Sequence, residues 1–351
     1  MTLSTIASLQ GMTPEHRETA VVHAQFVQLC EKIGRDQRPY YEASLADATG
    51  PVTFRIWSDA PELALVQEYQ PGQFVQLEAE FHRHPSFGLE AKHWRLRPLT
   101  PEERQTALYG PLIEQQQRDL ATIQSLADSI QDPRLKAICH QFLEEFGVRF
   151  RRTGAARGYH HARRGGLVEH VAQMMRDADA ICGVRPTLDR DLLLAGVLFH
   201  DSGKLWENIY EEEGFSMPYS ETAELLGHIA MGVELISILW RKIERPDWQT
   251  LEPSSDRVRR HLQHLVLSHH GEIAFGSPVV PKTPEAAALH YLDNLDAKLE
   301  MFAQGYKHAA KLGANVQERV RPLTGNLIAP LTTAAAPASA ETSEPSEGAM
   351  D

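Results

Sequence analysis

The chain has 351 residues, of which 42% are hydrophobic and 23% charged, and its formal net charge is −12 at pH 7. These are globular values, and no stretch approaches the roughly 20 apolar residues of a membrane span, so we expect a soluble protein. The N-terminus lacks the basic and long apolar segments of a secretory signal, which favours a cytoplasmic location. The negative charge disfavours simple coating of nucleic acid, because nonspecific binders usually present a basic surface. The length suffices for two domains.

The first hundred residues predict a small β-domain after an N-terminal extension over residues 1–18. From 19 to 99, short runs of alternating apolar and polar residues are separated by turn residues, which is typical of β-strands. Three strands, a short helix and two strands are expected, and this is the order of an OB-fold, a small barrel that often binds single-stranded nucleic acid or sugars. The predicted strands lie near residues 22–26, 41–45, 52–56, 75–81 and 89–96, and the helix near 61–69.

A helical domain is predicted from residue 100 to 322. Thr100 is placed to cap its first helix, with a proline at the next position and Glu103 three residues after the cap. Apolar residues then recur at helical spacing without a convincing strand, so this half is expected to be all-α. Residues 323–351 are rich in Ala, Pro, Ser and Glu and cannot bury a core, which predicts a disordered acidic tail.

The strongest chemical signal is the pair His200-Asp201, at the end of an apolar run. Adjacent His and Asp at a helix end can direct an imidazole nitrogen and a carboxylate oxygen toward one point. Such a pair alone is weak evidence, because many proteins contain one by chance. Further residues of ligand type lie within or beside predicted helices that carry an apolar face, so their side chains could converge inside a bundle. They are His170 upstream and His228, His269, His270 and Asp293 downstream.

This order of histidines and aspartates favours a metal centre over a set of unrelated structural histidines. Nitrogen and oxygen ligands without sulfur suit Mn²⁺, Fe²⁺, Co²⁺, Ni²⁺ or Zn²⁺ better than Ca²⁺. The set resembles the HD superfamily of metal-dependent phosphohydrolases. More narrowly, four runs resemble those of the YhaM-type 3′-to-5′ exoribonucleases: YHHARRGGLVEH, LLLAGVLFHDSGKLWE, LLGHIAMGVELI and LSHHGEIAFGSPVVPKTPEAAALHYLDNLDAK.

That family also carries an N-terminal OB-fold, so the resemblance extends over roughly residues 19–313. The helical half matches by long motifs and the barrel half by architecture and strand order. The resemblance implies a multidomain β + α protein, an OB-fold followed by an all-α HD domain. It further implies a metal-dependent phosphodiesterase that degrades single-stranded RNA, or single-stranded DNA, from the 3′ end. A homo-oligomeric state is left open.

The resemblance also implies two divalent cations bridged by Asp201, with Mn²⁺ favoured and Co²⁺, Fe²⁺, Ni²⁺ or Zn²⁺ as alternatives. Asp296, one helical turn beyond Asp293, is expected to orient a ligand or a water. Lys204 is placed like the lysine that contacts the scissile phosphate in many HD enzymes. The first cation would be held by His170, His200, Asp201 and Asp293, and the second by Asp201, His228 and His269, with His270 replacing or assisting His269.

A metal-activated water would attack phosphorus, and Lys204 with the cations would stabilise the nonbridging oxygens. The segment before the His170 helix is expected to grip substrate phosphates or protonate the leaving group, although a solvated basic loop is the alternative. Its residues are Tyr159, His160, His161, Arg163 and Arg164.

The predicted barrel offers six aromatic side chains for base stacking. Most of them are expected in the core, and one or two on a nucleic-acid-binding face. They are Tyr40, Tyr41, Phe54, Trp57, Phe87 and Trp94.

Three other functions compete with the exoribonuclease. A cyclic-dinucleotide phosphodiesterase of the HD-GYP kind would carry a GYP signature after the histidine pair, where this chain reads HHGEIAFGSP. A phosphohydrolase of free nucleotides would have little use for an OB-fold, except in assembly. A noncatalytic protein that binds single-stranded nucleic acid is disfavoured because every ligand-type position is filled.

Overall fold

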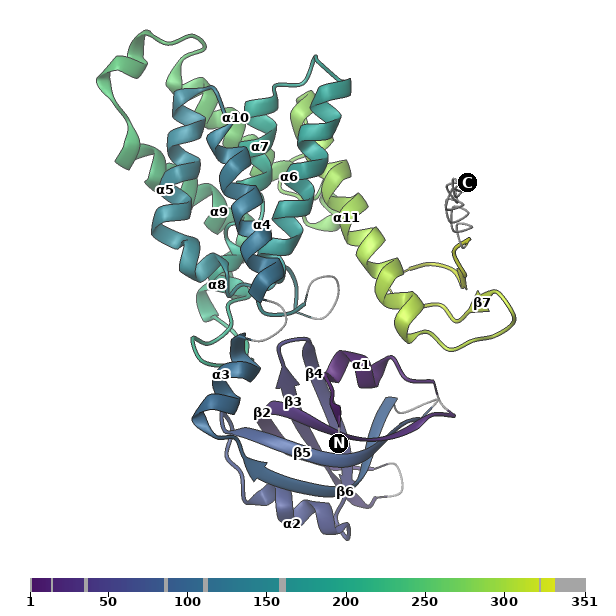
Figure 1. Ribbon diagram of the computed structural model, residues 1–351. Coiled ribbons are helices and arrows are strands. Elements are labelled where there is room, and N and C mark those ends of the chain that lie inside the picture. Colours follow the sequence, from purple (N-terminus) through teal and green to yellow (C-terminus); the bar gives the residue numbers. More distant parts are fainter. Residues whose placement is uncertain are drawn as a thin grey trace, which may run out of the picture.

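The structure is a computed structural model that describes residues 2–13, 15–34, 37–84, 88–109, 113–157, 162–321 and 323–331. A β-barrel forms its N-terminal part and a bundle of helices lies above it in Figure 1. The predicted fold class, an OB-fold followed by an all-α helical domain, is confirmed.

The barrel has the strand order of an OB-fold. Its neighbours along the sheet are β4, β3, β2, β5 and β6, all antiparallel. When these five strands are numbered from first to fifth along the chain, their order in the sheet is third, second, first, fourth, fifth. The helix α2 lies between the third and fourth of them in the chain. The elements are β2 (Arg17–Ile33), β3 (Pro39–Asp47), β4 (Gly50–Trp57), α2 (Pro61–Gln67), β5 (Phe74–His84) and β6 (Gly88–Pro98).

Alternation of side chains builds the barrel core. Along β4, Val52, Phe54 and Ile56 are buried while the residues between them face outward. This is the period of two that a half-buried strand requires. The five strands predicted from the same pattern are all present.

The predicted barrel aromatics divide into two kinds. Phe54 and Trp94 are core residues, and Tyr41 packs against the same core while partly buried. Trp57 is 50% exposed at the end of β4, which is not paired with β6 among the described residues. Tyr40 lies beside it, with ring centroids 5.9 Å apart. Phe87 lies outside the described residues. Contact of these aromatics with nucleic acid stays a prediction.

The N-terminal segment is part of the barrel, which corrects the expected extension over residues 1–18. A short strand β1 (Thr2–Leu3) pairs in parallel with β2, and the helix α1 (Ile6–Gln10) follows it. Ile6 and Leu9 are each 1% exposed within the barrel core. The Ile6 amide donates to a carboxylate oxygen of Asp47 at 2.7 Å. Two apolar residues in one short turn are too weak a periodic signal to predict this packing.

Nine α-helices follow the barrel among the described residues, and their shared core surrounds Phe142, Val171 and Phe199. Thr100 and Glu103 form the predicted reciprocal cap of the first: each backbone amide donates to the other's side chain, at 2.9 and 3.2 Å. The helices are α3 (Pro101–Tyr109), α4 (Ile113–Asp128), α5 (Pro133–Phe150), α6 (Gly166–Val184), α7 (Arg190–Phe199), α8 (Lys204–Glu207), α9 (Glu221–Ile243), α10 (Ser255–Ser268) and α11 (Pro284–His308), with the 3₁₀ turns η1 (Pro246–Thr250) and η2 (Ile273–Phe275).

The C-terminal segment carries structure where a disordered tail is expected. Strands β7 (Val316–Gln317) and β8 (Leu327–Ile328) pair in a small antiparallel hairpin after α11. Leu327 is 1% exposed. The expected all-α range to 322 and the expected tail from 323 are therefore wrong at this hairpin, because two-residue strands leave no periodic pattern. Residues 332–351 lie outside the described residues.

Helix α9 is the one described helix whose length and composition would let it cross a membrane. The helix is broken at Gly227, where φ is +73°. The straight part after the break is shorter than the roughly 20 residues of a span. Ile236, Leu239 and Trp240 on that part are at most 2% exposed, in the core of the bundle. The apolar composition of α9 is therefore accounted for by the core.

The barrel and the helical domain meet at the segment that links α8 to α9. The Gln25 side chain, 2% exposed on β2, accepts from the Phe215 amide at 2.6 Å. The ring of Phe215 lies against Phe74 of β5, with ring centroids 5.9 Å apart. Arg104 and Glu213 form an ion pair at 2.7 Å beside it. The chain that leaves the His200-Asp201 motif thus docks on the barrel.

We expect Phe215→Ala to loosen this junction. Loss of a buried phenylalanine typically costs about 3 kcal/mol, so the midpoint of urea unfolding should fall and limited proteolysis between residues 208 and 219 should accelerate. The control is Phe275→Ala, the same substitution at a side chain that is 62% exposed, which should change stability by less than about 0.5 kcal/mol. Equal effects of the two substitutions would contradict the junction.

Candidate metal centre

The motif His200-Asp201 lies where the most buried helix of the bundle ends. Every residue of α7 from Leu192 to Phe199 is buried, and Asp189 caps the start of the helix by accepting from the Leu192 amide at 3.0 Å. The His200 Nδ1–H donates back to the Val197 carbonyl at 2.7 Å. The apolar run therefore places an imidazole and a carboxylate, 0% and 3% exposed, in the middle of the domain.

Asp201 lies between two groups of histidines. Its Oδ2 atom is 3.3 Å from His200 Nε2 and 4.0 Å from His170 Nε2. Its Oδ1 atom is 3.5 Å from His228 Nε2 and 3.7 Å from His269 Nε2. The two oxygens of one carboxylate thus face separate nitrogen clusters, one on each side.

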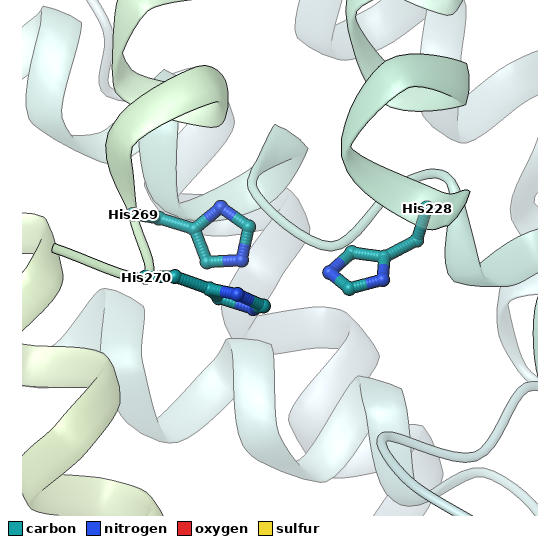
Figure 2. Close-up of side chains that lie close together, drawn as sticks. All are labelled: His228, His269 and His270. Carbon is teal, nitrogen blue, oxygen red and sulfur yellow. The ribbon is translucent and has the colours of Figure 1, made fainter. Parts of the chain in front are cut away.

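Each cluster is compact enough for a metal ion. Ligand atoms of His170, His200 and Asp201 lie within 4.8 Å of one another, and those of His228, His269 and His270 do the same. Figure 2 shows the three rings of the second cluster turned toward one another. Asp293 on α11 joins the first cluster, with Oδ1 3.4 Å from His170 Nε2. The structure therefore brings together every residue predicted as a ligand.

Backbone carbonyls set the orientation of the histidine rings. The Nδ1–H groups of His200, His269 and His270 donate to carbonyl oxygens at 2.7, 2.7 and 2.9 Å. A carbonyl accepts only, so the proton of each neutral ring is on Nδ1 and the lone pair is on Nε2. In His200 and His269 that lone pair points toward Asp201, which is the orientation that a metal ligand needs.

Among the buried polar atoms that have no hydrogen-bond partner in the described residues are three that face one another, Asp201 Oδ1, His228 Nε2 and His269 Nε2. An unsatisfied buried polar atom typically costs about 1–3 kcal/mol. A divalent cation between these atoms would satisfy all three at once. The donor set therefore fits a divalent metal ion.

Lys204 contacts the central carboxylate. Its ammonium group lies 2.6 Å from Asp201 Oδ2, and its side chain is 13% exposed. Burial by itself raises the pKa of Asp201, but the positive charge of Lys204 is the largest of the effects that oppose burial, and together they hold the pKa well below its usual range. Asp201 is therefore an anion ready to bind a cation.

Two carboxylates orient ligand histidines from behind. Asp296 Oδ2 accepts from His170 Nδ1 at 2.6 Å, which is the arrangement expected for a residue that orients a ligand. Glu207 Oε2 lies 2.9 Å from His228 Nδ1, an ion-pair distance without hydrogen-bond geometry. The sequence does not single out Glu207, because an acidic residue near the end of a short helix resembles an ordinary solvated side chain. Its spacing after Asp201, in the run HDSGKLWE, is the one available signal.

Glycines allow the elements of the centre to approach closely. A Cβ atom on Gly203 would lie 1.9 Å from the His228 carbonyl oxygen, so any side chain there would push α9 away from the motif. Gly271, with φ +78°, directly follows His270, and a Cβ on it would overlap the His290 ring at 2.2 Å. His290 in turn contacts the His269 carbonyl through Nδ1 at 2.8 Å. His290 is a further residue that the sequence did not single out.

The predicted substrate-binding arginines are engaged with the protein. Arg163 pairs with Glu169 and, at 3.3 Å, with Glu300. Arg164 is 8% exposed and donates to carbonyl oxygens of the segment between α8 and α9 at 2.6 to 3.0 Å. Both guanidinium groups thus bind partners within the protein. Their role in substrate binding stays a prediction. The other residues predicted to bind substrate or to protonate the leaving group, Tyr159, His160 and His161, lie outside the described residues.

An OB-type barrel joined to a helical bundle that gathers histidines and aspartates around a His-Asp pair defines an HD-domain protein, and residues 167–298 match the family model described as HD domain. The chain is 32% identical over 277 residues to the 3′-5′ exoribonuclease YhaM of Bacillus subtilis (strain 168), covering 77% of this chain and 82% of that protein. It is 30% identical over 305 residues to YhaM of Bacillus pumilus (strain SAFR-032), covering 85% and 90%. The chain therefore belongs to the YhaM 3′-5′ exoribonuclease family, as its motifs predicted.

Among solved structures, the second OB-fold domain of replication protein A from Methanococcus maripaludis is 17% identical. The match covers 28% of this chain and 100% of that domain, with a TM-score of 0.19. The assignment of the barrel as an OB-fold follows from its strand order.

Glu207→Gln should weaken metal binding, because the amide supports the His228 ring less strongly than the carboxylate does. Loss of such an outer partner typically costs about 10- to 100-fold in metal affinity, measurable by competition with a chromophoric chelator. The control is Glu212→Gln, whose side chain is 81% exposed. Unchanged affinity of the Glu207 variant would contradict the orienting role.

Metal binding should release protons at pH 7. Burial lowers the pKa of His170, but Asp293 and Asp296 outweigh burial and raise the pKa to about 9, so the metal-free ring holds a proton that a ligand nitrogen must lose. Affinity should therefore rise with pH by about tenfold per unit for this one proton, and level off above about pH 9. Calorimetry of Mn²⁺ binding in buffers of different ionisation enthalpy measures the release. Equal heats in all buffers would contradict it.

Proposed function

We propose that this protein is a metal-dependent 3′-to-5′ exoribonuclease that hydrolyses single-stranded RNA. The observation that carries the proposal is the position of Asp201, whose two carboxylate oxygens face two separate nitrogen clusters. This is the arrangement of a carboxylate that bridges two cations. Membership of the YhaM family supplies the substrate class and the direction of digestion.

The ligand assignment follows the two clusters. We assign His170, His200, Asp201 and Asp293 to a first cation and Asp201, His228 and His269 to a second, with His270 beside it. Mn²⁺ is our preferred ion, because the donors are nitrogen and oxygen without sulfur. Co²⁺, Fe²⁺, Ni²⁺ and Zn²⁺ are the alternatives.

Hydrolysis of a phosphodiester needs a nucleophile at neutral pH and neutralisation of the charge that grows on the nonbridging oxygens. The bound cations would supply the first by lowering the pKa of water. Lys204 is the residue of this chain that we assign to the second, because its ammonium group already lies 2.6 Å from the bridging carboxylate. Glu207 and Asp296 hold their histidines in place and take no part in bond making.

A 5′-labelled single-stranded RNA, incubated with metal-stripped protein to which Mn²⁺ is restored, should give a ladder that shortens from the 3′ end. Without metal the RNA should stay intact. Asp201→Ala should reduce the rate to below about 1% of wild type, while Asp247→Ala, at an exposed position of η1, should leave it unchanged.

Activity on mononucleotides or cyclic dinucleotides with intact RNA would reject the substrate and keep the metal centre. RNA binding without any hydrolysis would instead point to a noncatalytic protein. The single-stranded DNA substrate, the homo-oligomeric state and the cytoplasmic location stay predictions.

A further inference from the structure

Helix α11 carries its metal-centre carboxylates beyond the part of the helix that the apolar core holds. The side chains of α11 in that core are Ala286, Leu289 and Leu292. Asp293 and Asp296 come after them, and Figure 1 shows the second half of the helix extending past the ends of α4 and α6 toward β7. The position of these two carboxylates therefore depends on polar contacts that link α11 to α6.

Arg163, in the turn before α6, makes such a link. Its guanidinium contacts Glu169 of α6 through two nitrogens, with Nε 3.4 Å from Oε1 and Nη2 against Oε2. Its Nη1 lies 3.3 Å from Glu300 Oε1 on α11. Gln304, one turn further along α11, donates to the same oxygen at 2.8 Å. The three charged side chains are only 9 to 22% exposed, so water and salt screen these contacts weakly.

The two partners of this arginine are neighbours of residues at the metal centre. Glu169 directly precedes His170, and Glu300 lies one turn after Asp296, which accepts from His170 Nδ1 at 2.6 Å. Asp293 contacts the other nitrogen of the same ring, Nε2, at 3.4 Å. One guanidinium therefore closes the seam between α6 and α11 on which the first group of ligands is assembled.

The seam would be repulsive without that guanidinium. Glu169, Asp296 and Glu300 line one groove beside the two helices, and carboxylates that face one another at low exposure repel. Burial lowers the pKa of Arg163, but Glu169 and Glu300 outweigh burial and raise it, so the guanidinium is charged at any physiological pH. Two carboxylates share this one charge, so the seam keeps a net negative charge.

The remaining charges of the groove form a separate set. Asp119 of α4 and Arg176 of α6 pair with each other at 3.2 Å, and Asp177 of α6 adds one further negative charge. Because the pair of Asp119 and Arg176 joins α4 to α6 and does not involve α11, it offers a matched control.

We propose that Arg163 is a positioning residue: by neutralising Glu169 and Glu300 it holds α11 against α6, so that Asp293 reaches the first cation. The presence of that cation rests on the proposed function. Arg163 then acts through contacts within the protein and not as the phosphate ligand that the sequence predicts.

Hydrogen exchange of the metal-free full chain tests the contact itself. Arg163→Gln should speed exchange of the α11 amides after Leu292 by about tenfold or more, because removing one partner leaves buried charges uncompensated. Exchange in α7 should stay as in the wild type. Arg176→Gln, which removes the same charge from the neighbouring pair, should leave exchange in α11 unchanged.

Competition of Mn²⁺ with a chromophoric chelator tests the consequence for the metal centre. Arg163→Gln should weaken binding by about tenfold or more, as loss of an outer partner typically does. Loss of a nearby positive charge would by itself tighten the binding of a cation, so weaker binding identifies lost position. Arg163→Lys keeps the charge without the planar fork, and its affinity should lie between the two.

A double variant separates neutralisation from packing. Glu300→Gln added to Arg163→Gln restores the wild-type net charge and removes one of the facing carboxylates, so it should recover most of the lost exchange protection and Mn²⁺ affinity. If Arg163→Gln alone fails to fold, a folded double variant with near-wild-type affinity supports the positioning role, and a double variant that also fails to fold contradicts it.

The remaining outcomes are equally distinct. Unchanged exchange and affinity in Arg163→Gln, or equal effects of Arg163→Gln and Arg176→Gln on α11, would overturn the positioning role. A higher KM for RNA at unchanged metal affinity would overturn it too and make Arg163 a phosphate ligand. Because the exchange experiment contains neither metal nor RNA, a loss of α11 protection would support the role of Arg163 even if the wild type failed to shorten RNA.

Discussion

A single buried carboxylate sets the constraint on which the helical domain depends. Asp201 is 3% exposed at the end of an apolar helix, and a charge there is unfavourable unless cations surround it. Lys204 supplies part of the compensation within the chain. The oxygen of Asp201 and the nitrogens of His228 and His269 lack hydrogen-bond partners, and a bound cation would supply the remaining positive charge. The other helices of the centre are arranged so that each brings one or two ligand side chains toward this point.

The segment after the motif links the metal centre to the barrel. It begins with Lys204 at Asp201 and continues through Glu207 at His228. Arg164 then holds its backbone by three carbonyl oxygens, and Gln25 of the barrel binds Phe215 near its end. The metal centre and the barrel thus share one short stretch of chain.

Much of the fold and the set of candidate ligands could be predicted, because strong periods and rare residue types carry long-range information. Alternation predicted the five barrel strands, and histidines in helices with apolar faces predicted the cluster. The sequence could not predict contacts made by elements that are too short to show a periodic pattern. Ile6 and Leu327 fill hydrophobic gaps from very short elements. Glu207 acts through another side chain, so its role is visible only when His228 is placed beside it. The exposure of Trp57 depends on which strands leave the barrel open.

Each group of candidate ligands combines buried with partly exposed side chains. In the first group, His170 and His200 are 0% exposed and Asp293 is 20% exposed; in the second, His269 is 1% and His228 14% exposed. His228 directly follows the break at Gly227, where α9 changes direction. The direction in which the rest of α9 leaves this glycine therefore decides whether the His228 ring faces Asp201, so one backbone position couples the path of a long helix to the assembly of the second group.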